Sequence, residues 1–133
     1  MYFTKYEAAG NDFIVVDAQE DAGLVDFCMQ HASQLCDRHF GIGADGILMI
    51  TRTISGLEVS DIDAAMHVIN SDGSIAAMCG NGIRCIARHL YESCGFPISR
   101  GLQIGTLGGV QTVKCLDGHG DPWQIEVALG VDV

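Results

Sequence analysis

Apolar residues alternate with polar ones in short runs along the chain, a period of two that is typical of half-buried β-strands. The clearest run places Ile62, Ala64, Met66 and Val68 between more polar or smaller neighbours. We therefore predict a half-buried strand over residues 62–68 that leads into a turn at Asn70-Ser71-Asp72-Gly73. Other short runs predict strands at residues 2–8, 13–17 and 47–51, a turn at Gly10-Asn11-Asp12, and a loop at residues 41–46.

Two segments instead repeat their apolar residues every three or four positions, the spacing of an amphipathic helix. The first covers Leu24–Arg38 and the second begins near Asn81. The apolar side of the second helix consists of Ile83, Ile86, Ala87, Leu90 and Cys94. Gly95 and Pro97 follow directly, so we expect the second helix to end there.

The last third of the chain resembles a β-meander. We expect strands at Leu102–Thr106, Val110–Leu116 and Trp123–Leu129, separated by glycine-rich turns. Strands outnumber helices and most connections are short. The pattern therefore predicts an α+β fold in which a mostly antiparallel or mixed sheet curls around a central helix, with residues 1–133 as a single domain.

Composition narrows the classes of function. With 48% apolar and 18% charged residues, the 133-residue chain is expected to fold, and its formal charge of −10 argues against nucleic acid or an anionic membrane surface as partner. The N-terminus has no signal-peptide pattern and no segment has the length of a membrane span, so we expect a cytoplasmic protein. Six cysteines in such a chain are then expected to be reduced thiols.

Two short motifs match known ligand-binding patterns, one for dinucleotides and one for zinc, but their sequence context does not support either function. Residues 41–46, GIGADG, match the GxGxxG dinucleotide fingerprint, but a helix precedes and a strand follows, which reverses the order that phosphate binding needs. Cys36 and His39 have the spacing of half a zinc site, but no second pair exists at ligand spacing. We expect Cys36 to be a core residue at a helix end, and we predict no metal site.

Cys79, in MCGNGIRC, is the strongest candidate for chemistry. It stands just before the second helix, where unpaired backbone amides and the helix dipole stabilise an anion such as a thiolate. Gly80 and Gly82 would leave those amides uncovered for a substrate carboxylate. A tight strand-to-helix turn is an equally good explanation. A disulfide to Cys85 is not expected, because six residues along a helix separate the α-carbons by about 9 Å.

Asn11 and Asn70 stand where predicted strands meet turns. An asparagine amide can donate to a carboxylate and accept from an ammonium group, so either residue could bind an amino acid. Each could equally form an Asx-turn.

Four segments in order, AAGNDFIVVD, LCDRHFGIGADGIL, INSDGS and MCGNGIRC, resemble the N-terminal half of diaminopimelate epimerase. The resemblance implies an isomerase of lysine biosynthesis that uses two cysteines and no cofactor to convert LL-diaminopimelate to the meso form. Cys79 would be the first catalytic cysteine. The residues expected to bind substrate are Asn11, Asn70, Gly80 and Asn81. Pyridoxal phosphate is not expected, because Lys5 and Lys114 fall in predicted strands without a phosphate-binding loop.

The chain departs from the family in length. Members are about twice as long, and their second half carries the other cysteine, so this chain would be an N-terminal domain whose C-terminal domain is absent. A split gene or a homodimer with two facing Cys79 residues are alternatives, as is a non-catalytic half that binds a complementary domain. Related isomerases, similar to proline racemase or to phenazine-biosynthesis proteins, are the alternative activity, and a thiol redox protein is a weaker one. A smaller departure is Ala8, where the family tends to carry glycine.

Overall fold

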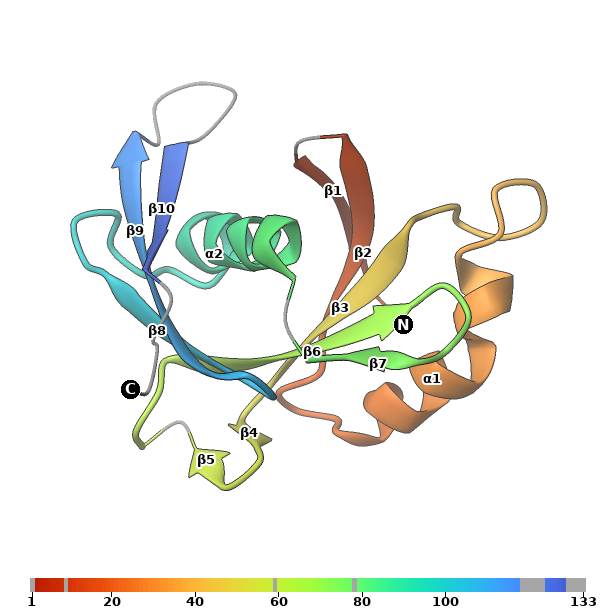
Figure 1. Cartoon of the computed structure of the whole chain (residues 1–133), viewed down its shortest axis with the longest axis horizontal. Coiled ribbons are helices and arrows are strands. Elements are labelled where there is room, and N and C mark those ends of the chain that lie inside the picture. The colour runs from red at the N-terminus through yellow and green to blue at the C-terminus, as the bar shows by residue number, and fades with distance from the viewer. Residues whose placement is uncertain (1, 9, 59, 78, 118–123, 129–133) are drawn as a thin grey trace.

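A mixed β-sheet forms the frame of the molecule in the computed structural model, which describes residues 2–8, 10–58, 60–77, 79–117 and 124–128. Its strand order is β1-β2-β3-β6-β8-β9-β10, with β7 beside β6 (Figure 1). The strands are β1 (Thr4–Ala8), β2 (Asn11–Asp17), β3 (Gly46–Thr51), β6 (Ala64–Asn70), β7 (Ile75–Ala76), β8 (Leu102–Thr106), β9 (Gly109–Asp117) and β10 (Gln124–Ala128). The pairs β2–β3 and β6–β8 are parallel and the other pairs antiparallel.

The sheet curls around α2 (Gly80–Ser93), as Figure 1 shows and as the sequence predicts. The two outermost strands, β1 and β10, both contact this helix although they lie at opposite ends of the strand order. The side of α2 that the sequence predicts to be apolar is almost inaccessible, with Ile83, Ile86, Ala87 and Leu90 all at 0% exposure. Burial of this stripe against β2, β3, β6 and β9 therefore holds the helix in the hollow of the sheet.

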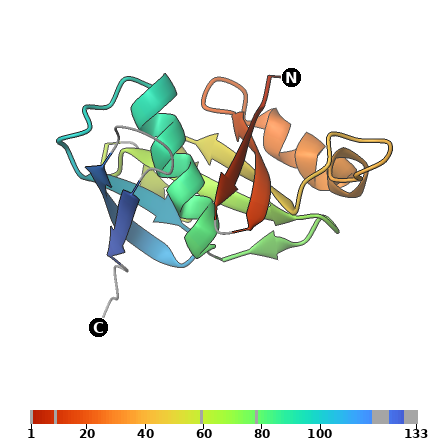
Figure 2. The same cartoon turned by 90° about the horizontal axis from the view of Figure 1, so that it is seen from above.

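The second helix, α1 (Gly23–Leu35), packs on the opposite face of the sheet against β3 and β6 (Figure 2). It ends at Leu35 rather than at the predicted Arg38. The reason is local: the Asp37 carboxylate accepts hydrogen bonds from the amides of His39 and Phe40, which turns the chain out of the helix. Neither α1 nor α2 has the length and hydropathy of a membrane-crossing helix, and the described residues contain no other helix of that kind.

The prediction of a half-buried strand at residues 62–68 is wrong in its burial and its start. The strand is β6, which begins at Ala64 in the middle of the sheet and is covered on both faces. Met66 packs toward α2 and Ile69 toward α1. Ala65 is covered by the short hairpin of β4 (Thr53–Ile54) and β5 (Leu57–Glu58), which the sequence pattern did not reveal.

The first hairpin is tighter than the sequence predicts. Asn11 and Asp12 are not turn residues but the first residues of β2, paired with Ala8 and Glu7. A two-residue connection suffices because Gly10 adopts a positive φ of 88°. The strands of the meander are confirmed as β8, β9 and β10, although the expected ends Trp123 and Leu129 lie outside the described residues.

Candidate active site

Cys79 caps the N-terminus of α2. Its backbone is extended, with φ −140° and ψ 113°, and its carbonyl accepts the first helical hydrogen bond from the Ile83 amide at 2.9 Å. Its Sγ accepts a hydrogen bond from the Gly82 amide at 3.3 Å. The side chain is half-buried, so the sulfur is neither sealed in the core nor remote from the helix. The helix end therefore presents donors and a partial positive charge to this sulfur.

The two glycines that flank Asn81 serve different purposes. Gly80 is exposed, and a Cβ built on it would meet no atom within 4 Å. A Cβ on Gly82 would lie 2.9 Å from Leu48 Cδ2 and 3.4 Å from Cys79 Sγ. The prediction that both glycines leave amides uncovered is wrong for Gly82, because this residue is buried and its amide already donates to the sulfur.

Asn11 and Asn81 meet although 70 residues separate them in the sequence. Asn81 Nδ2 donates to Asn11 Oδ1 at 2.8 Å, and Asn11 Nδ2 donates to Asp45 Oδ2 at 3.3 Å. The Asn11 side-chain amide thereby joins three segments, namely the start of β2, the start of α2 and the loop before β3. Three of the four predicted substrate-binding residues thus lie at this end of α2, namely Asn11, Asn81 and Gly80, the residue that follows Cys79.

Asp45 was missed by sequence reasoning, which treated residues 41–46 only as a rejected nucleotide motif. That rejection is consistent with the structure, because α1 precedes the loop and β3 follows it. Besides its contact to Asn11, the Asp45 carboxylate accepts a hydrogen bond from the Asp12 amide at 2.9 Å. Parallel pairing of β2 with β3 brings the loop here, and no local signal in the sequence could reveal that pairing.

Arg38 ties this loop to the first hairpin. Its guanidinium contacts both oxygens of Asp12, at 3.0 and 2.8 Å, and Asp45 Oδ1 at 3.1 Å. The Arg38 guanidinium, helped by Lys5 at 3.3 Å, holds the pKa of the Asp12 carboxyl well below its usual range. The charged cluster fixes the position of Asp45, and Asp45 in turn orients the Asn11 amide.

Asn70 lies at the same end of the sheet but bonds within its own turn. It is the last residue of β6 and pairs with Gly46, which itself pairs with Phe13 of β2. Its Nδ2 donates to Ser74 Oγ at 3.0 Å. Two strand spacings therefore separate Asn70 from β2, about 10 Å, and the structure does not join its side chain to Asn11 or Asn81.

The other cysteines near the predicted motifs are structural. Cys36 is the buried C-cap of α1, as the sequence predicts, and burial raises its pKa. Cys85 lies within α2 on its buried side and is 3% exposed, and burial raises the pKa of its thiol to about 11. No disulfide joins the six cysteines, all of which are described. Of the two cysteines in MCGNGIRC, only Cys79 reaches the helix N-terminus.

A sequence model of the family described as diaminopimelate epimerase matches residues 3–131. The chain belongs to this family. It is 43% identical over 131 residues to the diaminopimelate epimerase of Caldanaerobacter subterraneus subsp. tengcongensis, an alignment that covers 98% of this chain and 43% of that protein. The enzyme of Pelotomaculum thermopropionicum is 40% identical, with coverage of 98% and 44%. The chain therefore spans less than half the length of these curated relatives, and the resemblance noted in the sequence is confirmed.

Several solved structures of low sequence identity share the fold of this chain. A hydroxyproline epimerase from Agrobacterium vitis superposes with a TM-score of 0.61 at 16% identity, covering 88% of this chain and 38% of that one. A methylitaconate-delta-isomerase gives 0.60 at 13% identity, with coverage of 85% and 58%. A phenazine biosynthesis protein of the PhzF family from Bacillus anthracis gives 0.58 at 14% identity, with coverage of 94% and 37%. These likenesses show that the curled α+β fold predicted from the sequence is shared with known structures.

Proposed function

We propose that this chain supplies the first catalytic cysteine of a cytoplasmic diaminopimelate epimerase, an isomerase of lysine biosynthesis that converts LL-diaminopimelate to the meso form. The observation that supports the proposal is the place of the Cys79 sulfur, 3.3 Å from the Gly82 amide at the start of α2. As a thiolate, Cys79 removes the α-proton of the substrate. A thiol on the opposite face then donates a proton to the same carbon, so that the configuration inverts.

We propose that the opposite thiol comes from polypeptide outside these 133 residues; in support, the chain spans only 43–44% of the length of the first relatives. After one turnover Cys79 holds the proton and the other cysteine is the thiolate. Exchange with solvent, or turnover of the meso isomer in reverse, restores the starting state. We therefore propose that the chain acts as an N-terminal domain together with a complementary C-terminal domain, and is inactive by itself.

The start of α2 is also the proposed binding place of the substrate's α-carboxylate. Gly80 is exposed, and neither the Gly80 nor the Asn81 amide has a hydrogen-bond partner among the residues that the structure describes. Two such amides can hold a carboxylate and stabilise the negative charge that spreads onto it when the α-proton leaves. Asn11, Asn81 and Asn70 offer side-chain amides at the same end of the sheet for the remaining polar groups of the substrate.

No Schiff base or electron-accepting cofactor enters this scheme. Lys5 is engaged with Asp12 at 3.3 Å and lies in β1, while Lys114 lies in β9. Fixed dipoles of the helix end take the place of such a cofactor in stabilising carbanion character.

The test is Cys79→Ser in the complete enzyme, assembled from this chain and a separately made C-terminal half. General acid–base catalysis contributes about 10²–10⁴-fold, so we expect inversion of diaminopimelate to fall by that factor and α-hydrogen exchange with deuterated water to fall with it. Cys115→Ser, a half-buried cysteine of β9, is the matched control and keeps activity. Full activity of the Cys79 variant would end the proposal.

A complementation series separates this function from its alternatives. Turnover that appears only on mixing the halves supports the divided active site. Turnover by the 133-residue chain alone would contradict it, and would favour the homodimer with two facing Cys79 thiols. Inversion of proline or hydroxyproline in place of diaminopimelate would favour the related isomerases whose fold the chain shares.

A further inference from the structure

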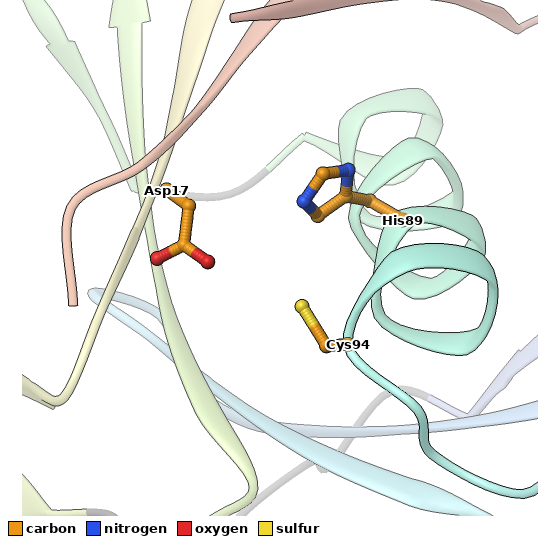
Figure 3. Close-up of side chains that lie close together, drawn as sticks. All are labelled: Asp17, His89 and Cys94. Carbon is orange, nitrogen blue, oxygen red and sulfur yellow. The ribbon is translucent and has the colours of Figure 1, made fainter. Parts of the chain in front are cut away.

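Three side chains with metal-binding atoms converge at the other end of α2. Figure 3 shows Asp17, His89 and Cys94 pointing toward one another, with one carboxylate oxygen, one ring nitrogen and the sulfur all within 4.8 Å of one another. Asp17 ends β2, His89 lies in the last turns of α2 and Cys94 is its C-cap. The cluster therefore joins two elements that the fold brings together, and none of its members belongs to the proposed active site.

The ring of His89 is oriented for ligation. His89 is 8% exposed, and its Nδ1 lies 3.2 Å from the Tyr6 hydroxyl. This contact occupies Nδ1 and leaves Nε2 as the nitrogen available to an ion. A hydrogen bond from the second ring nitrogen is the usual support of a metal-binding histidine, because it fixes the tautomer and the ring plane.

The carboxylate is positioned as well. Asp17 Oδ1 accepts a hydrogen bond from the Gln19 amide at 3.1 Å, and Oδ2 accepts one from Gln19 Nε2 at 3.3 Å. Each oxygen retains a lone pair for an ion. Since Asp17 is exposed, it also provides a path by which an ion can enter from solvent.

The electrostatic environment favours a cation. Asp17 supplies a carboxylate within 4.8 Å of the other two ligand atoms. Arg88, the nearest cation on the helix, is already paired with Glu92. The C-terminal end of a helix adds partial negative charge at Cys94.

We propose that Asp17, His89 and Cys94 form a binding site for a divalent ion of the zinc class, with water as a fourth ligand. Thiolate, imidazole and carboxylate together favour zinc or cobalt over magnesium or calcium. Binding forms a metal–sulfur bond and releases the Cys94 proton to solvent. Metal–ligand bonds of about 2.0–2.3 Å require the three atoms to approach by up to about 1 Å, so the ligand side chains have to rotate when the ion binds. From the sequence we predict no metal site, on the ground that no second Cys or His pair stands at ligand spacing; Asp17, His89 and Cys94 lie too far apart along the chain to form such a motif.

Such an ion would be structural rather than catalytic for the proposed reaction. The 14 residues of α2 separate the two ends of the helix by about 21 Å. The ion would link the end of β2 to the end of α2 and thereby stabilise the folded state by mass action. Activity of the complete enzyme and metal binding are therefore independent readouts.

The experiment is a titration of the purified, fully reduced protein with Co²⁺ and then with Zn²⁺. We expect a thiolate-to-cobalt charge-transfer band and the visible bands of four-coordinate cobalt, saturating at one ion per chain and displaced by zinc. Cys94→Ser should lose the charge-transfer band, and Asp17→Asn should weaken binding at least about tenfold. Cys115→Ser and Asp26→Asn, matched substitutions away from the cluster, should leave both unchanged.

Thermal unfolding provides a second measurement on variants that fold. At equal zinc concentration the midpoint should rise less in Asp17→Asn than in the wild type, and the exposed substitution leaves the core intact. Absence of cobalt bands in the wild type would overturn the proposal. So would bands that persist in Cys94→Ser, or that disappear in Cys79→Ser, because either result assigns the ion to another thiol.

Discussion

The paired substitutions Gly82→Ala and Gly80→Ala test whether the start of α2 is packed as described. Both replace a glycine in the first turn of the same helix, so each gains up to about 1 kcal/mol of helix propensity. The gain is common to both and cancels in the difference between them. What remains is the fit of one methyl group at two places.

At Gly82 the new methyl would lie 2.9 Å from Leu48 Cδ2, closer by about 0.6–1 Å than carbon atoms pack at their optimum. Leu48 is fully buried in β3 and cannot withdraw freely, and Cys79 Cβ stands at 3.3 Å on the other side. Overpacking of this kind costs about 1–3 kcal/mol. At Gly80 the methyl meets nothing within 4 Å, so no such cost arises.

We therefore expect Gly82→Ala to be less stable than Gly80→Ala by about 1–3 kcal/mol in urea unfolding, with equal m-values. In the complete enzyme both variants should lose activity for different reasons. The first displaces the Cys79 sulfur, whereas the second places a methyl group where the proposed substrate carboxylate binds. Equal stabilities for the two variants would refute the packing on which the place of Cys79 depends.

Three further predictions concern the loop that carries Asp45. Gly41→Ala should destabilise the protein by at least about 2 kcal/mol in urea unfolding, because its Cβ would lie 2.0 Å from the backbone oxygen of Gln34. Arg38 lowers the pKa of Asp12 in the folded state. The Asp12 carboxylate therefore stabilises the fold above its unfolded pKa of about 3.9, and this contribution is lost as the pH falls further. Asp12→Asn should accordingly flatten the loss of unfolding free energy between about pH 5 and 3. Asp45→Ala should lower kcat/KM of the complete enzyme by about tenfold, which equals the loss of one positioning contact of about 1.4 kcal/mol. Cobalt binding at the other end of α2 should persist in this variant. An unchanged kcat/KM would show that Asp45 does not contribute to the active site.

Local patterns were sufficient for the two helices and the main strands. The stripe from Ile83 to Leu90 is apolar at helical spacing, and the same residues are buried against the sheet. The helix cap at Cys79 could also be predicted from the sequence, because a small residue followed by glycines marks a helix start. These features depend on interactions between residues close in the sequence, which is where a single sequence is informative.

Features that depend on strand pairing could not be predicted from local sequence patterns. No sequence signal near β6 shows that both of its faces are covered. The alternating pattern therefore places Ala65 on a solvent face, although it is 0% exposed. Asp45 reaches Asn11 only because β2 and β3 run parallel. Asp17 and His89 meet only because β2 passes the last turns of α2.

The two ends of α2 carry a cysteine each, and the polarity of the helix distinguishes them. At Cys79 the leading amides offer hydrogen-bond donors, and the neighbouring Gly80 is exposed, so the proposed anionic ligand meets partial positive charge. At Cys94 the dipole is reversed and Asp17 adds a negative charge, so the proposed ligand is a cation. The direction in which α2 runs through the curled sheet is thus consistent with both proposals, proton transfer by Cys79 and metal binding by Cys94. The Cys79→Ser and Cys94→Ser variants should each lose one of these properties and keep the other.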